Sequence, residues 1–182
     1  MTTHFLTISN LNISKGILTL LDACSLLKDC DADFHLHVVG AETVEISATR
    51  FSEEIECRGL QEKVTYHGRQ YGEDKEQRLA EASVLVHPTL NDCFPLVLLE
   101  AMQHQLPIIA TPVGAIPDMV VDGENGFIVP EHEAEALANG MKKLIDNPQM
   151  AADMGKLGHD RFLKNYTSST FENNLVKILM YI

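Results

Sequence analysis

The stretch Val84–Met102 reads VLVHPTLNDCFPLVLLEAM and joins a strand-like run to a helix-like run through a short polar loop. The first four residues are apolar enough for a strand buried on both faces, and Pro95 is typical of a first helical turn because proline needs no amide partner there. Two carboxylates, Asp92 and Glu100, follow the strand. Glu100 lies among apolar residues. Because a buried, unpaired acid is costly, it either pairs with another side chain or faces a ligand crevice.

The strand-then-helix pattern repeats along the whole chain. Strands are predicted at 4–9, 34–39, 64–67, 84–87, 107–111 and 126–130. Helices are predicted at 15–28, 42–58 and 73–83, after Pro95, and two or three times beyond Glu131. This alternation predicts an α/β fold: a Rossmann-like, doubly wound parallel sheet of about six strands, with helices on both faces and C-terminal helices. If the strand order is 3-2-1-4-5-6, a ligand crevice lies where the loops after strands one and four meet.

Composition limits the classes of function. The 182 residues suit one domain, and a net charge of −12 disfavours a nucleic-acid surface, which needs clustered Lys and Arg. No signal-peptide pattern and no membrane-spanning apolar run are found, so we expect a cytoplasmic protein, at most peripheral to a membrane. The cysteines are expected to be reduced, with Cys24 and Cys57 as small core residues of helices.

Two segments carry possible chemistry, each with a plainer alternative. Lys15-Gly16, after the first strand, is either an anion cradle or a solvated lysine beside a flexible glycine. In the second segment, the amides of Cys93, Phe94 and Leu96 could face a phosphate, and Glu100 lies roughly 7–8 Å further along the helix. That reach fits a diphosphate and a ribose hydroxyl. The alternative is Asp92 as a helix cap and Glu100 as a satisfied buried acid.

Other polar residues give weaker signals. Gly114, in the loop Thr111–Asp118, permits close approach to a ligand, although a simple turn explains it better. Asp122–Gly126 is expected to be a turn. His35 and His37 share one strand face and, without a third ligand, are expected to be packing or edge residues; His104 is expected to be a surface histidine. No dinucleotide fingerprint and no P-loop motif are present.

A series of motifs closely resembles the C-terminal half of glycosyltransferase family 4. The resemblance covers about residues 5 to 165 and rests on Pro88–Met102, Leu106–Thr111, Gly114, Asp118, Asp122–Gly126, Lys15-Gly16, Val38–Gly40 and Val64–Gly68. It implies half of a GT-B fold and a retaining hexosyltransferase. Such an enzyme uses a UDP- or GDP-sugar without a metal or another cofactor, and transfers the sugar to a glycan or lipid-linked acceptor.

The resemblance also implies residue roles. Lys15 and Asp92 would be catalytic, with Lys15 on the donor diphosphate and Asp92, in place of the family's first glutamate, on the donor sugar. Glu100 would bind the ribose hydroxyls. The implied donor-binding set is Asn10, Lys15, Gly16, Gly68, Arg69, Asp92, Cys93, Phe94, Pro95, Leu96 and Glu100. Within it, Gly68 and Arg69 would lie beside the base. Asn10 replaces an arginine of the family and Pro95 replaces a glycine, so the chain has one positive charge and one amide fewer.

The domain organisation implied is incomplete. Residues 1–182 would form a single nucleotide-sugar-binding domain, while the N-terminal acceptor domain of a GT-B enzyme is absent from this chain and would act in cis or in trans. Alone, the domain would be weakly active or inactive. Two alternatives remain open: a non-catalytic nucleotide-sugar binding module or partner subunit of a split transferase, and a sugar phosphorylase or epimerase of related fold.

Overall fold

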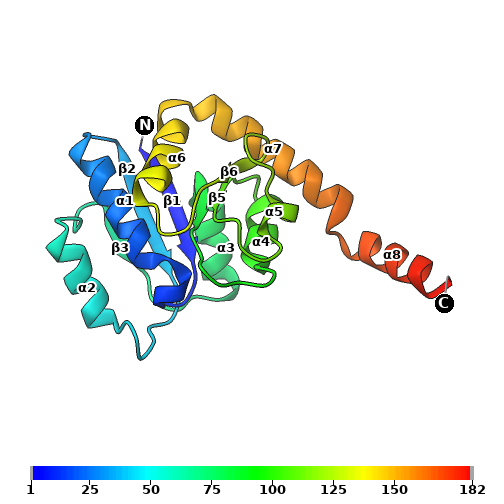
Figure 1. Ribbon diagram of the computed structural model, residues 1–182, viewed down its shortest axis with the longest axis horizontal. Coiled ribbons are helices and arrows are strands. Elements are labelled where there is room, and N and C mark those ends of the chain that lie inside the picture. The colour runs from blue at the N-terminus through cyan, green and yellow to red at the C-terminus, as the bar shows by residue number, and fades with distance from the viewer. Residues whose placement is uncertain (1, 181–182) are drawn as a thin grey trace.

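A single parallel sheet organises the molecule, whose computed structural model describes residues 2–180. The strand order is β3-β2-β1-β4-β5-β6 (Figure 1). The strands are β1 (Thr3–Ile8), β2 (Phe34–Val39), β3 (Val64–Tyr66), β4 (Val84–His87), β5 (Ile108–Ala110) and β6 (Gly126–Ile128). This confirms the predicted doubly wound sheet, its six strands and the reversal of order between β1 and β4, where a ligand crevice is expected.

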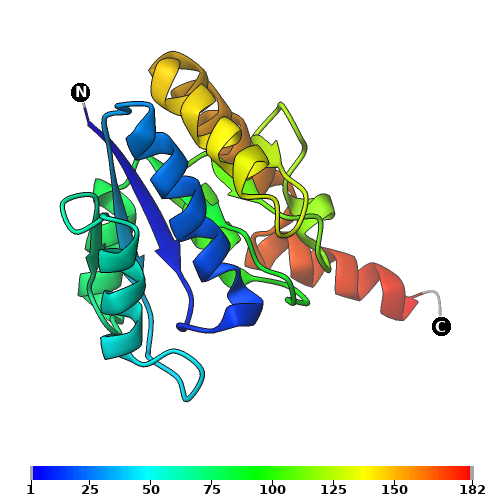
Figure 2. The same cartoon turned by 60° about the vertical axis from the view of Figure 1, so that its left-hand side comes forward.

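Helices cover both faces of the sheet. They are α1 (Ile17–Asp29), α2 (Ala48–Cys57), α3 (Gly72–Glu81), α4 (Leu96–Gln103), α5 (Ile116–Met119), α6 (Ala134–Asp146), α7 (Pro148–Asn165) and α8 (Ser168–Met180), with a 3-10 turn, η1 (Ile13–Lys15). Phe5 faces a core shared with α1, α2 and α6, whereas its neighbour Leu6 faces a core shared with α3, α4 and α5. The helices α1 and α6 lie side by side in Figure 2. Because both faces are covered, most strand residues are apolar, and polar residues such as His35 and His37 of β2 are exceptions.

The predicted helix 42–58 is too long at its start, because α2 begins only at Ala48. Thr43 donates to the carbonyl of Leu11 at 2.6 Å and accepts from the amide of Ile46, which holds the preceding segment as a loop. Ile46 is fully buried there. Ser47 then caps the helix by accepting from a backbone amide of its first turn. Ile46, an apolar residue within the predicted helix, is thus the anchor of a loop.

The prediction of a core position is confirmed for Cys24 and wrong for Cys57, which is exposed. Phe51 and Ile55 form the buried face of α2. Cys57 lies two residues beyond Ile55, about 200° around the helix, and therefore points to solvent.

The C-terminal part contains three helices beyond Glu131, as predicted, and one additional turn of helix before them. The segment Thr111–Asp118, expected to be only a turn, includes the start of α5. The helix α8 projects away from the sheet in Figure 1 and exposes apolar side chains, among them Phe171 and Ile178. Within the described chain, no helix is long and apolar enough to cross a membrane.

Candidate functional site

The loops after β1 and β4 meet at the carboxyl edge of the sheet. Gly16 adopts a left-handed φ of 69°, and a Cβ atom there would lie 1.9 Å from the carbonyl oxygen of Pro88. The amide of Leu90 donates to the carbonyl of Ser14 at 2.8 Å, which ties the two loops together. Only glycine permits this approach. The contact places Lys15 directly against the loop that carries Asp92.

Lys15 and Asp92 form an ion pair across this junction. The Lys15 ammonium lies 2.8 Å from Asp92 Oδ2 and 2.9 Å from the carbonyl oxygen of Asn91. Burial raises the pKa of Asp92, but the hydrogen bond and charge of Lys15, together with His87, lower it below its usual value. An ammonium has three N–H donors, and residues 2–180 occupy two of them on Lys15. One donor therefore stays available to an anion.

His87 is the residue of this site that sequence reasoning missed. It ends β4, is 3% exposed, and places Nε2 3.5 Å from Asp92 Oδ2. That contact lacks hydrogen-bond geometry, and Nε2 has no other partner among the described residues. Burial lowers the pKa of His87 to about 4, against the opposing charge of Asp92. The imidazole is therefore neutral at physiological pH. Its place at the carboxyl end of a strand was the signal that could have identified it.

The segment between β4 and α4 presents free backbone amides. Those of Cys93, Phe94 and Leu96 donate no hydrogen bond within the described chain. Pro95, expected inside the first helical turn, is instead the N-cap residue of α4, because its backbone is still extended at φ −72° and ψ 106°. Phe94 and Leu96 are exposed residues, and their amides have no partner among residues 2–180. A helix N-terminus with free amides suits an anion.

Gly114 packs against the same segment from the loop after β5. Its φ is 56°, and a Cβ atom there would lie 2.1 Å from the carbonyl oxygen of Asp92. The next amide, of Ala115, donates to the carbonyl of Cys93 at 2.9 Å. The glycine that sequence reasoning assigned to a simple turn thus supports the loop carrying Asp92.

Glu100 has a partner that the sequence did not reveal. Its Oε1 lies 2.7 Å from the ammonium of Lys75 on α3, and both side chains are partly buried, with 31% and 22% of their surface exposed. Glu100 also lines a groove of about 510 Å³ together with Phe162 and Tyr166. Glu100 therefore has a partner and also borders an open groove, but neither Lys15 nor Asp92 lines that groove. Lys75 was missed because only tertiary packing brings α3 against α4.

A small pocket of about 150 Å³ lies at the ends of β1 and β2 and reaches Lys75. Its lining includes Arg69, Gln70 and Tyr71. The guanidinium of Arg69 lies over the Tyr71 ring, 4.7 Å from its centroid. Gln70 Oε1 is buried without a hydrogen-bond partner among residues 2–180. An orphaned acceptor beside a flat, stacked surface is suited to a planar ligand with an N–H group.

Two more predicted residues shape this pocket through hydrogen bonds with backbone amides of neighbouring loops. Asn10 Oδ1 accepts from the amide of Ala41 at 3.2 Å, so its side chain holds the loop after β2. The carbonyl of Gly68 accepts from the amide of Gly40 at 2.9 Å, which joins the loops after β2 and β3. All the predicted donor-binding residues thus lie at the carboxyl edge. The hydrogen bonds of Asn10 and Gly68 at this edge hold neighbouring loops together.

Four histidines line the α3 face of the sheet, from His4 near the start of β1 to His67 just after β3. His37 bonds to His4 at 3.1 Å through one ring nitrogen and to His67 at 2.9 Å through the other. His35 bonds instead to the hydroxyl of Thr65 at 2.8 Å. We call these four residues the histidine row. Packing roles were expected for His35 and His37, and the structure confirms that both are packed in this row.

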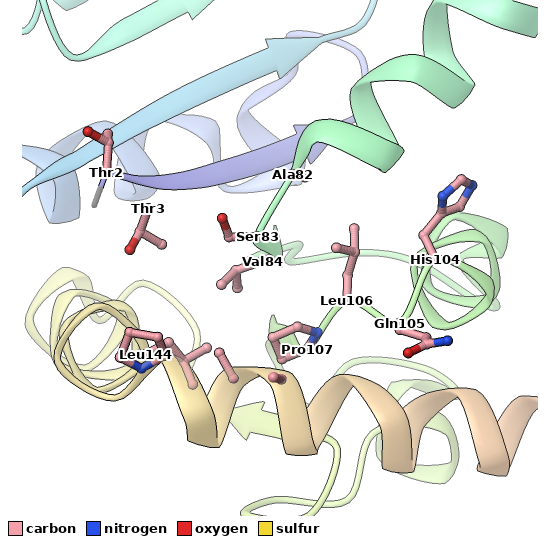
Figure 3. A pocket seen from close by; sticks show the side chains of 13 residues that line it. Thr2, Thr3, Ala82, Ser83, Val84, His104, Gln105, Leu106, Pro107 and Leu144 are labelled. Atoms are coloured by element: carbon pink, nitrogen blue, oxygen red, sulfur yellow. The ribbon is translucent and has the colours of Figure 1, made fainter.

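A separate cavity of about 300 Å³ lies at the amino edge of the sheet (Figure 3). Its labelled lining residues include Thr2, Ser83, His104 and Pro107, from β1, β4, α4 and β5 or their flanks. His104, expected at the surface, bonds to Glu76 at 2.9 Å and is partly exposed. None of the predicted site residues lines this cavity, and parallel sheets bind ligands at the opposite edge.

Comparisons with known proteins agree with this geometry. The family model "Glycosyl transferases group 1" matches residues 2–161. D-inositol 3-phosphate glycosyltransferase of Arthrobacter sp. is 29% identical over 159 residues, which cover 84% of this chain and 37% of that protein. Sucrose-phosphate synthase of Thermosynechococcus elongatus superposes with a TM-score of 0.84 at 26% identity, over 99% of this chain and 46% of the other. HepE of Anabaena, solved with UDP, superposes with a TM-score of 0.89 at 22% identity. The superposition covers 100% of this chain and 49% of HepE.

The chain thus spans less than half the length of these relatives. Its sheet and helices correspond to one of the two Rossmann-like halves of a GT-B glycosyltransferase, as the sequence motifs predicted. The family model extends over most of the chain, from β1 into α7. The chain therefore belongs to the glycosyl transferases group 1 family.

Proposed function

We propose that this chain is the donor-binding domain of a retaining hexosyltransferase that uses a UDP- or GDP-sugar. The observation that carries the proposal is the occurrence, along one sheet edge, of a lysine with a free N–H, three free amides at and just before the start of α4, and a partly buried glutamate. A diphosphate is suited to Lys15 and the amides before α4. A ribose is suited to Glu100, and the base to the pocket lined by Arg69 and Gln70.

The proposed reaction transfers the sugar with retention to a glycan or lipid-linked acceptor. Charge develops on the leaving diphosphate, and the Lys15 ammonium together with the amides of α4 would stabilise it without a metal ion. Asp92 would accept from a hydroxyl of the donor sugar. The UDP complex of HepE supports the nucleotide assignment by analogy of fold.

An acceptor domain, in cis or in trans, would complete the active site. Two observations support this part of the proposal. The chain covers 37% of the length of its relative from Arthrobacter. The helix α8 exposes Phe171, Leu175 and Ile178, with exposed fractions of 67%, 43% and 60%, and such an apolar face is suited to a covering partner. The domain alone is then expected to bind the sugar donor weakly and to transfer the sugar poorly.

A non-catalytic nucleotide-sugar binding module is the second candidate. One observation favours it: Asp92 neutralises Lys15, and the side chain of Asn10, where the resembling family carries an arginine, is engaged by Ala41. The site then has little net positive charge to offset a leaving diphosphate. Adding an acceptor-domain half and a UDP-sugar separates the two candidates, because only a transferase releases UDP in proportion to glycosylated acceptor.

Calorimetry tests the site itself with UDP, GDP and inorganic pyrophosphate. Replacing Glu100 by glutamine should weaken UDP or GDP about 10-fold and leave pyrophosphate unchanged, because pyrophosphate has no ribose. Lys15→Met should lower the affinity for each of these anions that the wild type binds. Glu53→Gln, at an exposed position of α2, is the matched control and should change nothing. EDTA should leave affinity unchanged. If neither nucleotide binds at millimolar concentration, the proposed function is wrong.

A further inference from the structure

The buried nitrogen of His87 is unexplained by the roles given so far. His87 is 3% exposed, and Nε2 has no hydrogen-bond partner in the described part of the chain. A buried polar atom without a partner is destabilising by comparison with an apolar side chain of similar shape. The carboxylate oxygen Oδ2 of Asp92 lies 3.5 Å from this nitrogen. A small movement of either side chain would bring the two atoms within hydrogen-bond distance.

Asp92 shares its present donor with the proposed ligand. Lys15 holds Asp92 Oδ2 at 2.8 Å in the free chain. A diphosphate that engages the same ammonium competes for it, since the two anions attract the same charge. The side chain of Asp92 has only 19% of its surface exposed, so water replaces a lost N–H poorly. Lys15 can receive the ligand through its free N–H, but where the diphosphate draws the ammonium away from Asp92, the carboxylate needs another donor.

We propose that His87 is a positioning residue that donates from its neutral Nε2–H to Asp92 Oδ2 once a nucleotide diphosphate engages Lys15. This rests on the proposed function and deepens it. The exchange keeps the carboxylate oriented toward the donor sugar while the ammonium turns to the phosphate. Lys15 and Asp92 are the charged groups that act on His87, and their effects on its pKa oppose one another. The imidazole therefore stays neutral, with one N–H to give, above about pH 5.

Three variants and a double-mutant cycle test this role by UDP calorimetry. His87→Phe keeps a ring but removes the N–H donor, and it should lower the affinity for UDP about 10-fold. His87→Gln places an amide N–H near the position of Nε2 and should stay within about 3-fold of the wild type. With Asp92→Asn as background, His87→Phe should cause a smaller loss, because a neutral amide oxygen accepts a hydrogen bond more weakly than a carboxylate. Equal UDP affinity of His87→Phe and wild type, or the same loss in the Asp92→Asn background, would overturn the proposal.

Nuclear magnetic resonance of the wild-type chain gives a readout that does not depend on a variant folding. With 15N-labelled histidine, the Nε2–H signal of His87 should shift downfield as UDP is added and saturate with the calorimetric affinity. An unmoved signal at saturating UDP contradicts the inference and leaves the proposed function standing. If the wild type binds neither UDP nor GDP, the proposed function and the inference about His87 are both wrong.

Discussion

The histidine row should make the fold sensitive to mild acid, and His37 is its centre. Both ring nitrogens of His37 are bonded to neighbouring imidazoles, and two adjacent rings cannot both be protonated without breaking the bond between them. Burial and the nearby His35, His67, His4 and Arg78 lower the pKa of His37 to about 4. The pKa values of His35 and His67 are lowered too, with burial as the largest cause; Lys63 also lowers that of His35, and Glu81 partly opposes the shift of His67.

The sign and size of the effect follow from linkage. Because the folded pKa of His37 lies below the ordinary value of 6.5, the unfolded chain takes up the proton first. The contribution to stability is fully present above pH 6.5 and is lost as the pH falls from 6.5 toward 4. At pH 5 the loss would be about 2 kcal/mol for a fully buried ring. His37 is only partly buried, so solvent screening reduces this to about 1 kcal/mol.

Urea unfolding at pH 7.5 and pH 5.0 measures this loss. His37→Asn removes the titrating ring, so the wild type should lose about 1 kcal/mol more than the variant between the two pH values. The variant is compared with itself, so any packing cost common to both pH values cancels. His132→Asn is the control, since His132 is exposed and asparagine tolerates its φ of 60°. Equal pH dependence of the wild type and His37→Asn would refute the reasoning.

Two further predictions concern the loop that carries Asp92. Gly114→Ala should destabilise the chain by about 1–3 kcal/mol in thermal unfolding and weaken UDP binding, because the new Cβ meets the carbonyl of Asp92. Gly123→Ala, at a φ of +77° with no atom within 4 Å, carries the same kind of backbone strain without the clash and should leave UDP binding unchanged. UDP should also slow thiol labelling of exposed Cys93 but not of exposed Cys57. Equal protection of both thiols would place the ligand elsewhere.

Much of the fold was predictable because its signals are local. Continuous apolar runs such as Val84–His87 mark strands buried on both faces, and their alternation with amphipathic segments determines a parallel sheet. Errors occurred where one side chain had two possible explanations. Ile46 fits a helix face as well as a loop anchor, and only its contacts around Thr43 distinguish the two.

In the candidate site, Asp92, Glu100 and Lys15 were named from the sequence, whereas Lys75, the partner of Glu100, was not. Asp92 and Glu100 stand out because charged residues beside apolar runs are rare. Lys75 does not stand out, because a lysine on a charged helix such as α3 is ordinary and its bond to Glu100 depends on helix packing. The histidine row is similarly hidden, since His4 and His67 come together only through the order of β1, β2 and β3.

Each predicted acid is thus neutralised by a lysine in the free chain, Asp92 by Lys15 and Glu100 by Lys75. An anion therefore meets no patch of excess positive charge here, on a protein whose net charge is −12. It can engage the free N–H of Lys15, but closer contact with either ammonium requires an exchange of ion pairs. Partly exposed pairs contribute only about 0–1 kcal/mol, so this exchange costs little, but it also adds little attraction. Affinity must then come from short-range contacts to the amides, ribose and base. Salt should consequently weaken nucleotide binding far less than it weakens binding to an open basic surface.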